Sequence, residues 1–234
     1  LSPAIVWQLG LPLTREIPVL AAEQIIFLRK LARKTWAFFE SSVGPDDNWL
    51  PPDNIQEIPV AIVAHRTSPT NMGITLLANL TAYDFGYISV GQFIHRTENT
   101  IQTMTKLERY RGHFYNWYDT ISLVPLEPRY ISTVDSGNLS AHLLTLRAGL
   151  TALSDQPLVN PRLFEGLLDT LQILIDAAGG KVPVTLQSFH ENLTAARQSF
   201  LHSKSMPLLS VMTHLNTLTD AATVFSKNLS SDKT

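Results

Sequence analysis

Apolar residues recur along most of the chain at intervals of three and four positions, the period of a helix with one buried face. Alternation of apolar and polar positions, which would indicate strands, is scarce. The pattern therefore predicts an all-α fold. The expected helices cover residues 23–40, 68–86, 90–107, 136–153, 160–179, 186–200 and 208–225.

Residues with strong preferences for helix ends mark several of these boundaries. Pro69 follows Ser68, and the first turn of a helix tolerates proline. Asp135 or Ser136 could cap the fourth helix, which we therefore expect to begin after them. The glycine pair at 179–180 is typical of the end of the fifth helix.

The two halves of the chain differ in the segments that connect the helices. Residues 44–138 contain long connections rich in Trp, Tyr, Asn and Asp, whereas residues 157–234 have the pattern of plain amphipathic helices. Long connections in a compact domain are usually functional or disordered, and the aromatic content of these favours ordered loops. We therefore expect residues 1–156 to form a domain with site-forming loops and residues 157–234 to form a helical insertion or appendage.

Charge and composition narrow the classes of partner. The chain of 234 residues has a net charge of −2, which leaves no basic surface for nucleic acid. Only 16% of its residues are charged, whereas typical soluble domains have about 25%. We therefore expect no nucleic-acid partner, and we expect much of the surface to meet other protein.

Other residue types exclude further kinds of site. The chain has no cysteine, so disulfides, thiolate metal ligands and cysteine nucleophiles are excluded. His65, His95, His113 and His142 lack the spacing of metal ligands, so no metal site is expected. No apolar run reaches about 18 residues, so we expect no membrane span in this segment. The start of the chain has no basic region ahead of an apolar stretch, so we expect no signal peptide there.

The first segment with candidate chemistry is the loop at residues 44–54, where Trp49 stands among carboxylates and amides. Such mixtures bind sugars, because an aromatic face stacks on C–H groups while polar side chains bond the hydroxyls. Alternatively, this is a capped loop whose tryptophan is anchored in the core.

The second segment, residues 65–71, begins the second predicted helix with several hydrogen-bond donors. Donors at the positive end of a helix favour an anionic or hydroxyl-rich partner. The alternative is that Ser68 only caps the helix, Arg66 pairs with a loop carboxylate and His65 is merely tucked away.

The third segment, residues 109–120, has four aromatic rings within five residues. A core role could use Phe114 and Trp117, but not all four rings. Buried tyrosine hydroxyls, Asn116 and Asp119 would each need partners, which a saccharide cleft supplies. Residues 135–138 could add polar groups to such a site, or could serve only as a helix cap.

Glycoside chemistry needs two carboxyl groups a few ångströms apart. The spacing of the carboxylates in these loops identifies no such pair, so the catalytic residues stay unassigned. The candidates are Asp46, Asp47, Asp53, Glu57, Asp119 and Asp135.

Taken together, these segments resemble the central region of cyclic β-1,2-glucan synthases. The resemblance extends over about residues 20–153 and is much less distinctive after Gln156. The matching segments are Arg33–Glu40, Asp47–Asn54, His65–Asn71, Leu107–Thr120, Pro128–Tyr130 and Val134–Leu139.

The resemblance implies a large multidomain enzyme of the bacterial inner membrane that elongates β-1,2-glucan from UDP-glucose, with this segment on the cytoplasmic side. Its middle region, similar to an (α/α)6 toroid, would close linear glucan into a ring by retaining transglycosylation. This chain would hold the first helices of the toroid and an additional helical subdomain. The paired catalytic carboxylates are then expected outside the chain. UDP-glucose would be used by a separate domain, so we expect no cofactor here.

The resemblance also implies partners and binding residues. The expected partners are β-1,2-glucan and the remaining domains of the parent polypeptide. The alternative function is a non-catalytic helical scaffold or domain-docking module of the same large enzyme. The residues expected to contact glucan are Trp49, Arg66, Thr67, Asn71, Tyr115, Trp117, Asp119, Asp135 and Asn138.

Overall fold

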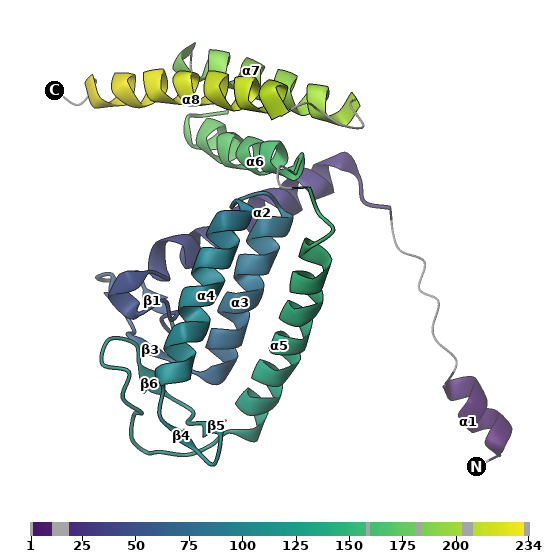
Figure 1. Cartoon of the computed structure of the whole chain (residues 1–234), viewed down its shortest axis with the longest axis vertical. Helices are drawn as coiled ribbons and strands as arrows, with labels where there is room; N and C mark the ends of the chain where they lie inside the picture. Colours follow the sequence, from purple (N-terminus) through teal and green to yellow (C-terminus); the bar gives the residue numbers. More distant parts are fainter. Residues whose placement is uncertain (1, 11–18, 158–159, 181–183, 203–207, 232–234) are drawn as a thin grey trace.

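The computed structural model describes residues 2–10, 19–157, 160–180, 184–202 and 208–231. These residues form mainly helices, so the predicted all-α class is confirmed (Figure 1). All seven expected helices are present, and α1 is an additional short one. The helices are α1 (Pro3–Leu9), α2 (Ala22–Ser42), α3 (Pro69–Asp84), α4 (Val90–Lys106), α5 (Thr133–Leu153), α6 (Arg162–Ala177), α7 (Val184–His202) and α8 (Leu208–Ser231).

Short elements shape the long connections between the first helices. A 3-10 turn, η1 (Pro45–Asp47), follows α2. Three antiparallel pairs of two-residue strands lie in these connections, and the β4–β5 pair lies at the end of the bundle of α2 to α5 where α5 begins (Figure 1). The pairs are β1 (Ile55–Gln56) with β2 (Ile62–Val63), β3 (Arg66–Thr67) with β6 (Tyr118–Asp119), and β4 (Arg109–Tyr110) with β5 (His113–Phe114).

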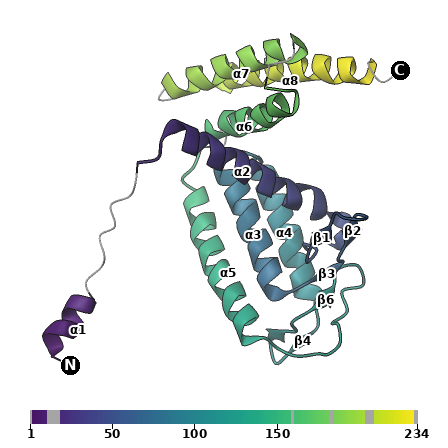
Figure 2. The same cartoon turned by 180° about the vertical axis from the view of Figure 1, so that it is seen from behind.

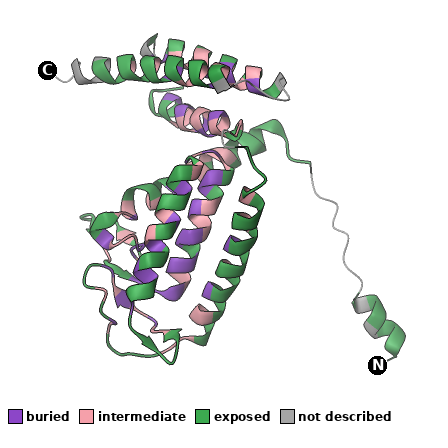
Figure 3. Cartoon of the chain, in the orientation of Figure 1, coloured by how far each residue is buried: buried purple, intermediate pink, exposed green. Residues whose placement is uncertain are grey.

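Helix α3 is the centre of the first core, because it contacts α2, α4 and α5 (Figure 2). Its surface is accordingly buried over much of its length (Figure 3). Burying each large apolar side chain contributes about 1.5–3 kcal/mol, so this cluster supplies much of the stability of the bundle formed by α2, α3, α4 and α5. The buried members are Trp36, Leu50, Met72, Leu76, Ala82, Tyr83, Ile88, Phe93, Met104, Leu107, Tyr118, Leu139 and Leu146.

A second core holds helices α6, α7 and α8 together. In both views α7 and α8 lie side by side across the end of the bundle, with α6 between them and α2 (Figures 1 and 2). The predicted division of the chain near residue 156 stays a prediction, because two cores can belong to one domain or to two. The buried members of the second core are Phe164, Leu171, Ile175, Leu186, Leu193, Ala196, Phe200, Val211 and Leu218.

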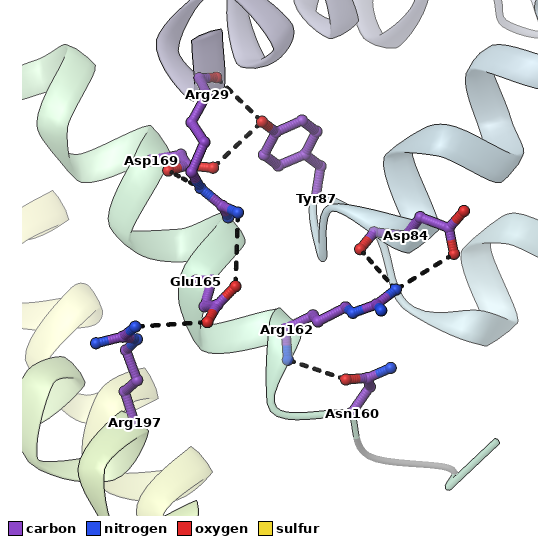
Figure 4. A network of polar contacts seen from close by, with 8 residues as sticks. All are labelled: Arg29, Asp84, Tyr87, Asn160, Arg162, Glu165, Asp169 and Arg197. Carbon is purple, nitrogen blue, oxygen red and sulfur yellow. Dashed lines mark hydrogen bonds and ion pairs between the residues drawn. The ribbon is translucent and has the colours of Figure 1, made fainter. Parts of the chain in front are cut away.

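Charged side chains connect the two cores (Figure 4). Arg29 on α2 donates to Asp169 on α6 over 2.9 Å and lies 3.5 Å from a Glu165 oxygen. The Tyr87 hydroxyl donates to the other Asp169 oxygen over 3.2 Å. Burial, together with Asp169, raises the pKa of Tyr87, so this hydroxyl stays protonated. The polar face of α2 therefore lies against α6.

Helix α5 begins earlier than predicted. Its N-cap is Ser132, whose hydroxyl accepts from the backbone N–H of Asp135 over 3.1 Å. The prediction that Asp135 or Ser136 caps the helix is therefore wrong. Ser132 meets the same requirement for an acceptor one turn earlier. As a result, the Asp135 carboxylate lies in the first helical turn and is available to partners from other elements.

Candidate functional site

Most of the predicted site residues come from segments that meet at one end of the bundle. Helices α3 and α5 both begin there, and the long loops lie around their first turns (Figure 1). The strand pair β3–β6 joins two of these loops, with Arg66 opposite Asp119 and Thr67 opposite Tyr118. Segments far apart in the sequence thus form one polar region.

Arg66 is held between a carboxylate and an aromatic ring. Its Nη2 lies 2.9 Å from Asp53 Oδ2, and its guanidinium carbon lies 5.0 Å from the centroid of the Trp117 ring. The other Asp53 oxygen accepts from the Asn71 side chain over 3.4 Å. The side chain of Arg66 is 50% exposed, so this ordered guanidinium still presents donors to a ligand.

Asp135 is the acceptor at the centre of the neighbouring polar group. The Thr70 hydroxyl donates to Asp135 Oδ1 over 2.6 Å, and the Asn138 amide donates to the Thr70 hydroxyl over 3.1 Å. Burial by itself would raise the pKa of Asp135, but hydrogen bonds from Ser132 and Thr70 outweigh it and lower that pKa. The carboxylate is therefore ionised and fixed in direction.

Asn116 links Asp135 to the aromatic residues. With its amide nitrogen toward Asp135, Asn116 donates to Oδ2 over 2.9 Å. Its oxygen then accepts from the Tyr130 hydroxyl and from Trp117 Nε1, each over 2.7 Å. In this orientation the amide nitrogen faces an acceptor and the amide oxygen faces donors. Trp117 consequently touches both polar groups, with its ring against Arg66 and its N–H on Asn116.

The Asp119 carboxylate stabilises a turn. Its Oδ1 accepts from the backbone N–H of Ile121 over 3.0 Å, and from the N–H and hydroxyl of Ser122 over 2.7 and 2.8 Å. The hydrogen bond from the Ser122 N–H is the main cause that lowers the pKa of Asp119. One carboxylate oxygen is thus used by the protein itself.

This arrangement makes the turn sensitive to acid. Because the folded-state pKa of Asp119 is depressed, its contribution to stability is present above its ordinary pKa of 3.8 and is lost as the pH falls below it. We expect Asp119→Asn to reduce the loss of stability that occurs as the pH falls below about 4. Urea unfolding at a series of pH values measures this effect. The same substitution at exposed Asp155 is the control, and equal acid dependence in both variants would contradict the prediction.

Two further predicted residues differ in their access to solvent. Thr67 is fully buried, and its hydroxyl has no hydrogen-bond partner among the described residues. Tyr115 is partly buried, with its ring 6.5 Å from the Tyr118 ring and near the Arg129 guanidinium. Their roles as glucan contacts stay predictions.

Trp49 lies apart from the other predicted site residues. Its ring packs edge-on against His95 at 5.2 Å and lies 5.7 Å from the Arg96 guanidinium, both on α4. The loop of residues 44–54 therefore contributes to the polar region through Asp53 rather than through its tryptophan.

The aromatic residues of the third segment divide between the core and the surface, and Phe114 packs against the core as expected. Tyr118 is the fully buried ring of this segment, whereas Phe114 and Trp117 are only partly buried. The Tyr118 hydroxyl accepts from the Tyr115 N–H over 2.8 Å and donates to the Glu108 carbonyl over 2.7 Å. These partners let Tyr118 occupy a buried core position in addition to Phe114.

The sequence did not single out Thr70 or Tyr130. The alternative that Arg66 pairs with a loop carboxylate is confirmed, and the structure identifies that carboxylate as Asp53. Thr70 and Asp53 stand in the segments that carried the predictions, but nothing in their spacing shows which partner each would meet. Within the described ranges, no group of three or more His, Cys, Asp or Glu side chains is placed to hold a metal ion.

Comparisons with known proteins identify relatives of the chain. No protein-family model matches it. A putative glucoamylase from Bacteroides fragilis NCTC 9343 is similar in structure with a TM-score of 0.44 and 18% identity, over 56% of this chain and 32% of that one. Cyclic beta-(1,2)-glucan synthase NdvB of Rhizobium meliloti (strain 1021) is 42% identical over 178 residues. The match covers 75% of this chain but only 6% of the length of NdvB. At this identity over three quarters of its length, the chain belongs, as a short segment, to the cyclic β-(1,2)-glucan synthase family.

Proposed function

We propose that the chain contributes a glucan-binding surface to the region of a cyclic β-1,2-glucan synthase that cyclises linear β-1,2-glucan by retaining transglycosylation. The observation that carries this proposal is the contact of half-exposed Arg66 with Trp117, held in place by Asp53. An aromatic face beside fixed donors and acceptors suits a sugar, which offers both C–H faces and hydroxyls.

The carboxylates of the site are proposed to orient other groups and not to react. Asp53 holds Arg66, Asp119 holds a turn, and Asp135 accepts from Thr70. Each therefore has a hydrogen-bonding role within the protein. We accordingly place the acid and nucleophile of the cyclisation in other parts of the parent polypeptide.

The parent enzyme is proposed to carry its other activities outside this chain. UDP-glucose would be used by a separate domain, so that no cofactor binds here. The chain would lie on the cytoplasmic side of the bacterial inner membrane and would meet the remaining domains of the parent. Across the described residues, the helices lack the length and hydropathy needed to cross a membrane.

Calorimetric titration of the chain with linear β-1,2-glucan tests this function. We expect selective binding over a β-1,3-glucan, and about tenfold weaker binding by Trp117→Ala, because an aromatic contact worth about 1.4 kcal/mol is lost. The control is Trp7→Ala, which removes a tryptophan that is 69% exposed on α1. Absence of binding by the folded chain, or equal affinity of the two variants, would refute the proposal.

One observation favours the alternative function, a helical docking module. An apolar groove of about 480 Å³ runs between α2 and α3. It is lined by residues such as Leu31, Trp36 and Leu77, which lie on the faces that the sequence pattern marked as apolar. A docking module would cover this groove with another protein domain and would ignore sugar, so the same titration separates the two functions.

A further inference from the structure

A hollow lies beside β3 and shares Arg66 with the contact between Arg66 and Trp117. Its volume is about 450 Å³, within the range of about 300–1,000 Å³ that is usual for small-molecule sites. Its lining residues belong to strands β1, β2, β3 and β6 and to the segments next to them. The lining residues are Asn54, Gln56, Ile62, Ala64, His65, Arg66, Asp119 and Leu126.

The side chain of His65, one of the lining residues, is held by a buried carboxylate outside the hollow. Its Nδ1 lies 2.8 Å from Asp47 Oδ1, and Asp47 is only 8% exposed. The Thr120 hydroxyl donates to the same Asp47 oxygen, and the Thr120 N–H donates to the His65 carbonyl over 3.1 Å. The interpretation that His65 is merely tucked away is therefore incomplete, since its side chain is 44% exposed.

The partner at Nδ1 determines what the other ring nitrogen offers. A carboxylate accepts hydrogen bonds, so Nδ1 carries the proton toward Asp47. In the neutral imidazole, Nε2 is then an acceptor. Within the described part of the chain, Nε2 has no hydrogen-bond partner. The pocket thus contains an oriented ring nitrogen that the fold itself does not use, and a sugar hydroxyl can either donate to it or accept from it.

The charges around the pocket select the class of ligand. Arg66 is the cation of the lining, and Asp53 already pairs with it. Asp119 from β6 and Asp47 from η1 add further carboxylates next to His65. With three carboxylates against one guanidinium, an anion such as a nucleotide phosphate is disfavoured. The amides of Asn54 and Gln56 suit a neutral ligand rich in hydroxyls.

We propose that this pocket binds neutral sugar hydroxyls, with His65 Nε2 as a hydrogen-bonding partner and Asp47 as the residue that positions the ring. The inference rests on the proposed function and adds to it a second contact point for the glucan. It also assigns a ligand class, because the pocket takes a neutral saccharide and rejects a nucleotide sugar.

The test uses His65→Asn, because the Asn amide can still donate to Asp47 while nothing replaces Nε2. We expect about fivefold weaker binding of linear β-1,2-glucan, the loss of one ordinary hydrogen bond. The matched control is His113→Asn, which changes an exposed histidine of the β4–β5 hairpin and should bind like the wild type. In His65→Gln, whose amide oxygen can reach the Nε2 position, part of the affinity should return.

A second readout distinguishes direct contact from a structural effect. In NMR titrations of the wild-type chain, the His65 imidazole signals should shift on addition of β-1,2-glucan, whereas those of His190 and His214 on α7 and α8 should not. UDP-glucose should leave the His65 signals unchanged.

The possible results separate this inference from the proposed function. Glucan binding that is weakened by Trp117→Ala but unchanged by His65→Asn, with unshifted His65 signals, would overturn the inference alone. Shifts caused by UDP-glucose would overturn the assigned ligand class. Absence of any glucan binding would overturn the inference together with the proposed function.

Discussion

Gly86→Ala is expected to separate the α6–α8 layer from the bundle and to lower the free energy of unfolding by about 3–5 kcal/mol. Gly86 has a φ of +76°, which an alanine adopts only with strain. A Cβ there would lie 1.9 Å from the Arg162 carbonyl oxygen, and a backbone atom cannot move aside as a flexible side chain can. On the facing side, Gly166 brings the α6 backbone equally close, because its Cβ would lie 2.2 Å from the Gly86 oxygen.

The chain offers a matched control for this effect. Gly112 has a φ of +88°, but a Cβ there would meet nothing within 4 Å. Gly112→Ala should therefore show only the backbone strain, about 1–2 kcal/mol. Urea unfolding of both variants measures the difference, and equal destabilisation would contradict the role of Gly86 in holding the two layers together.

Two spectroscopic signals can show where the Gly86→Ala variant loses structure. Apart from Trp7, the tryptophans of the chain belong to the bundle, as Trp36, Trp49 and Trp117. Tryptophan fluorescence therefore follows mainly the bundle, whereas far-UV circular dichroism follows all the helices. We expect the circular dichroism transition of this variant to begin at lower urea than the fluorescence transition.

Arg96→Met is expected to cost about 3 kcal/mol, because hydrogen bonds from a charged donor to carbonyls are lost. Arg96 Nη2 donates to the carbonyls of Phe39 and Val43 at the end of α2, over 2.7 and 3.0 Å. Its guanidinium also lies 5.1 Å from the Trp36 ring centroid and 5.7 Å from that of Trp49. One side chain thus caps α2 and anchors the loop that leads to Asp53.

Burial lowers the pKa of Arg96, and the negative charge of Glu40 opposes this shift. An arginine stays charged even after such a shift, so the cation remains available for the carbonyls and rings. Lysine lacks the planar fork of the guanidinium, so Arg96→Lys should recover only part of the lost stability. Thermal or urea unfolding of both variants measures the effect.

The control for Arg96 is Arg147→Met on the exposed side of α5, where we expect a change within about 0.5 kcal/mol. If Arg96→Met were no more destabilising than Arg147→Met, the capping of α2 by Arg96 would contribute nothing measurable. If Arg96→Met instead unfolded the chain, Arg96→Lys would still test the role of the guanidinium.

Local patterns in the sequence were sufficient to predict the helices. The apolar period located α2 to α8, and Pro69 after Ser68 marked the start of α3, where Ser68 does accept from the Asn71 N–H over 3.2 Å. The start of α5 was placed too late because Ser132 and Asp135 are both good caps. Only the path of the chain decides which one is used.

The residues of the site were predicted in part. The resemblance to glucan synthases marked Arg66, Trp117 and Asp135, which do lie in one polar region. It also marked Trp49, whose ring packs instead against His95 of α4. The difference arises because a motif specifies residue types, whereas the direction of a side chain depends on what packs against its loop.

The sequence by itself determined the helical class, the positions of α2 to α8 and the family, because these depend on local periodicity and on motifs of consecutive residues. The tertiary structure alone decided which polar groups meet, such as Asp47 with His65 and Asn116 with Asp135. It also decided that the apolar faces of α2 and α3 form a groove instead of a closed core. Both outcomes depend on contacts between segments that are distant in the chain, and no local pattern encodes the distance between two side chains.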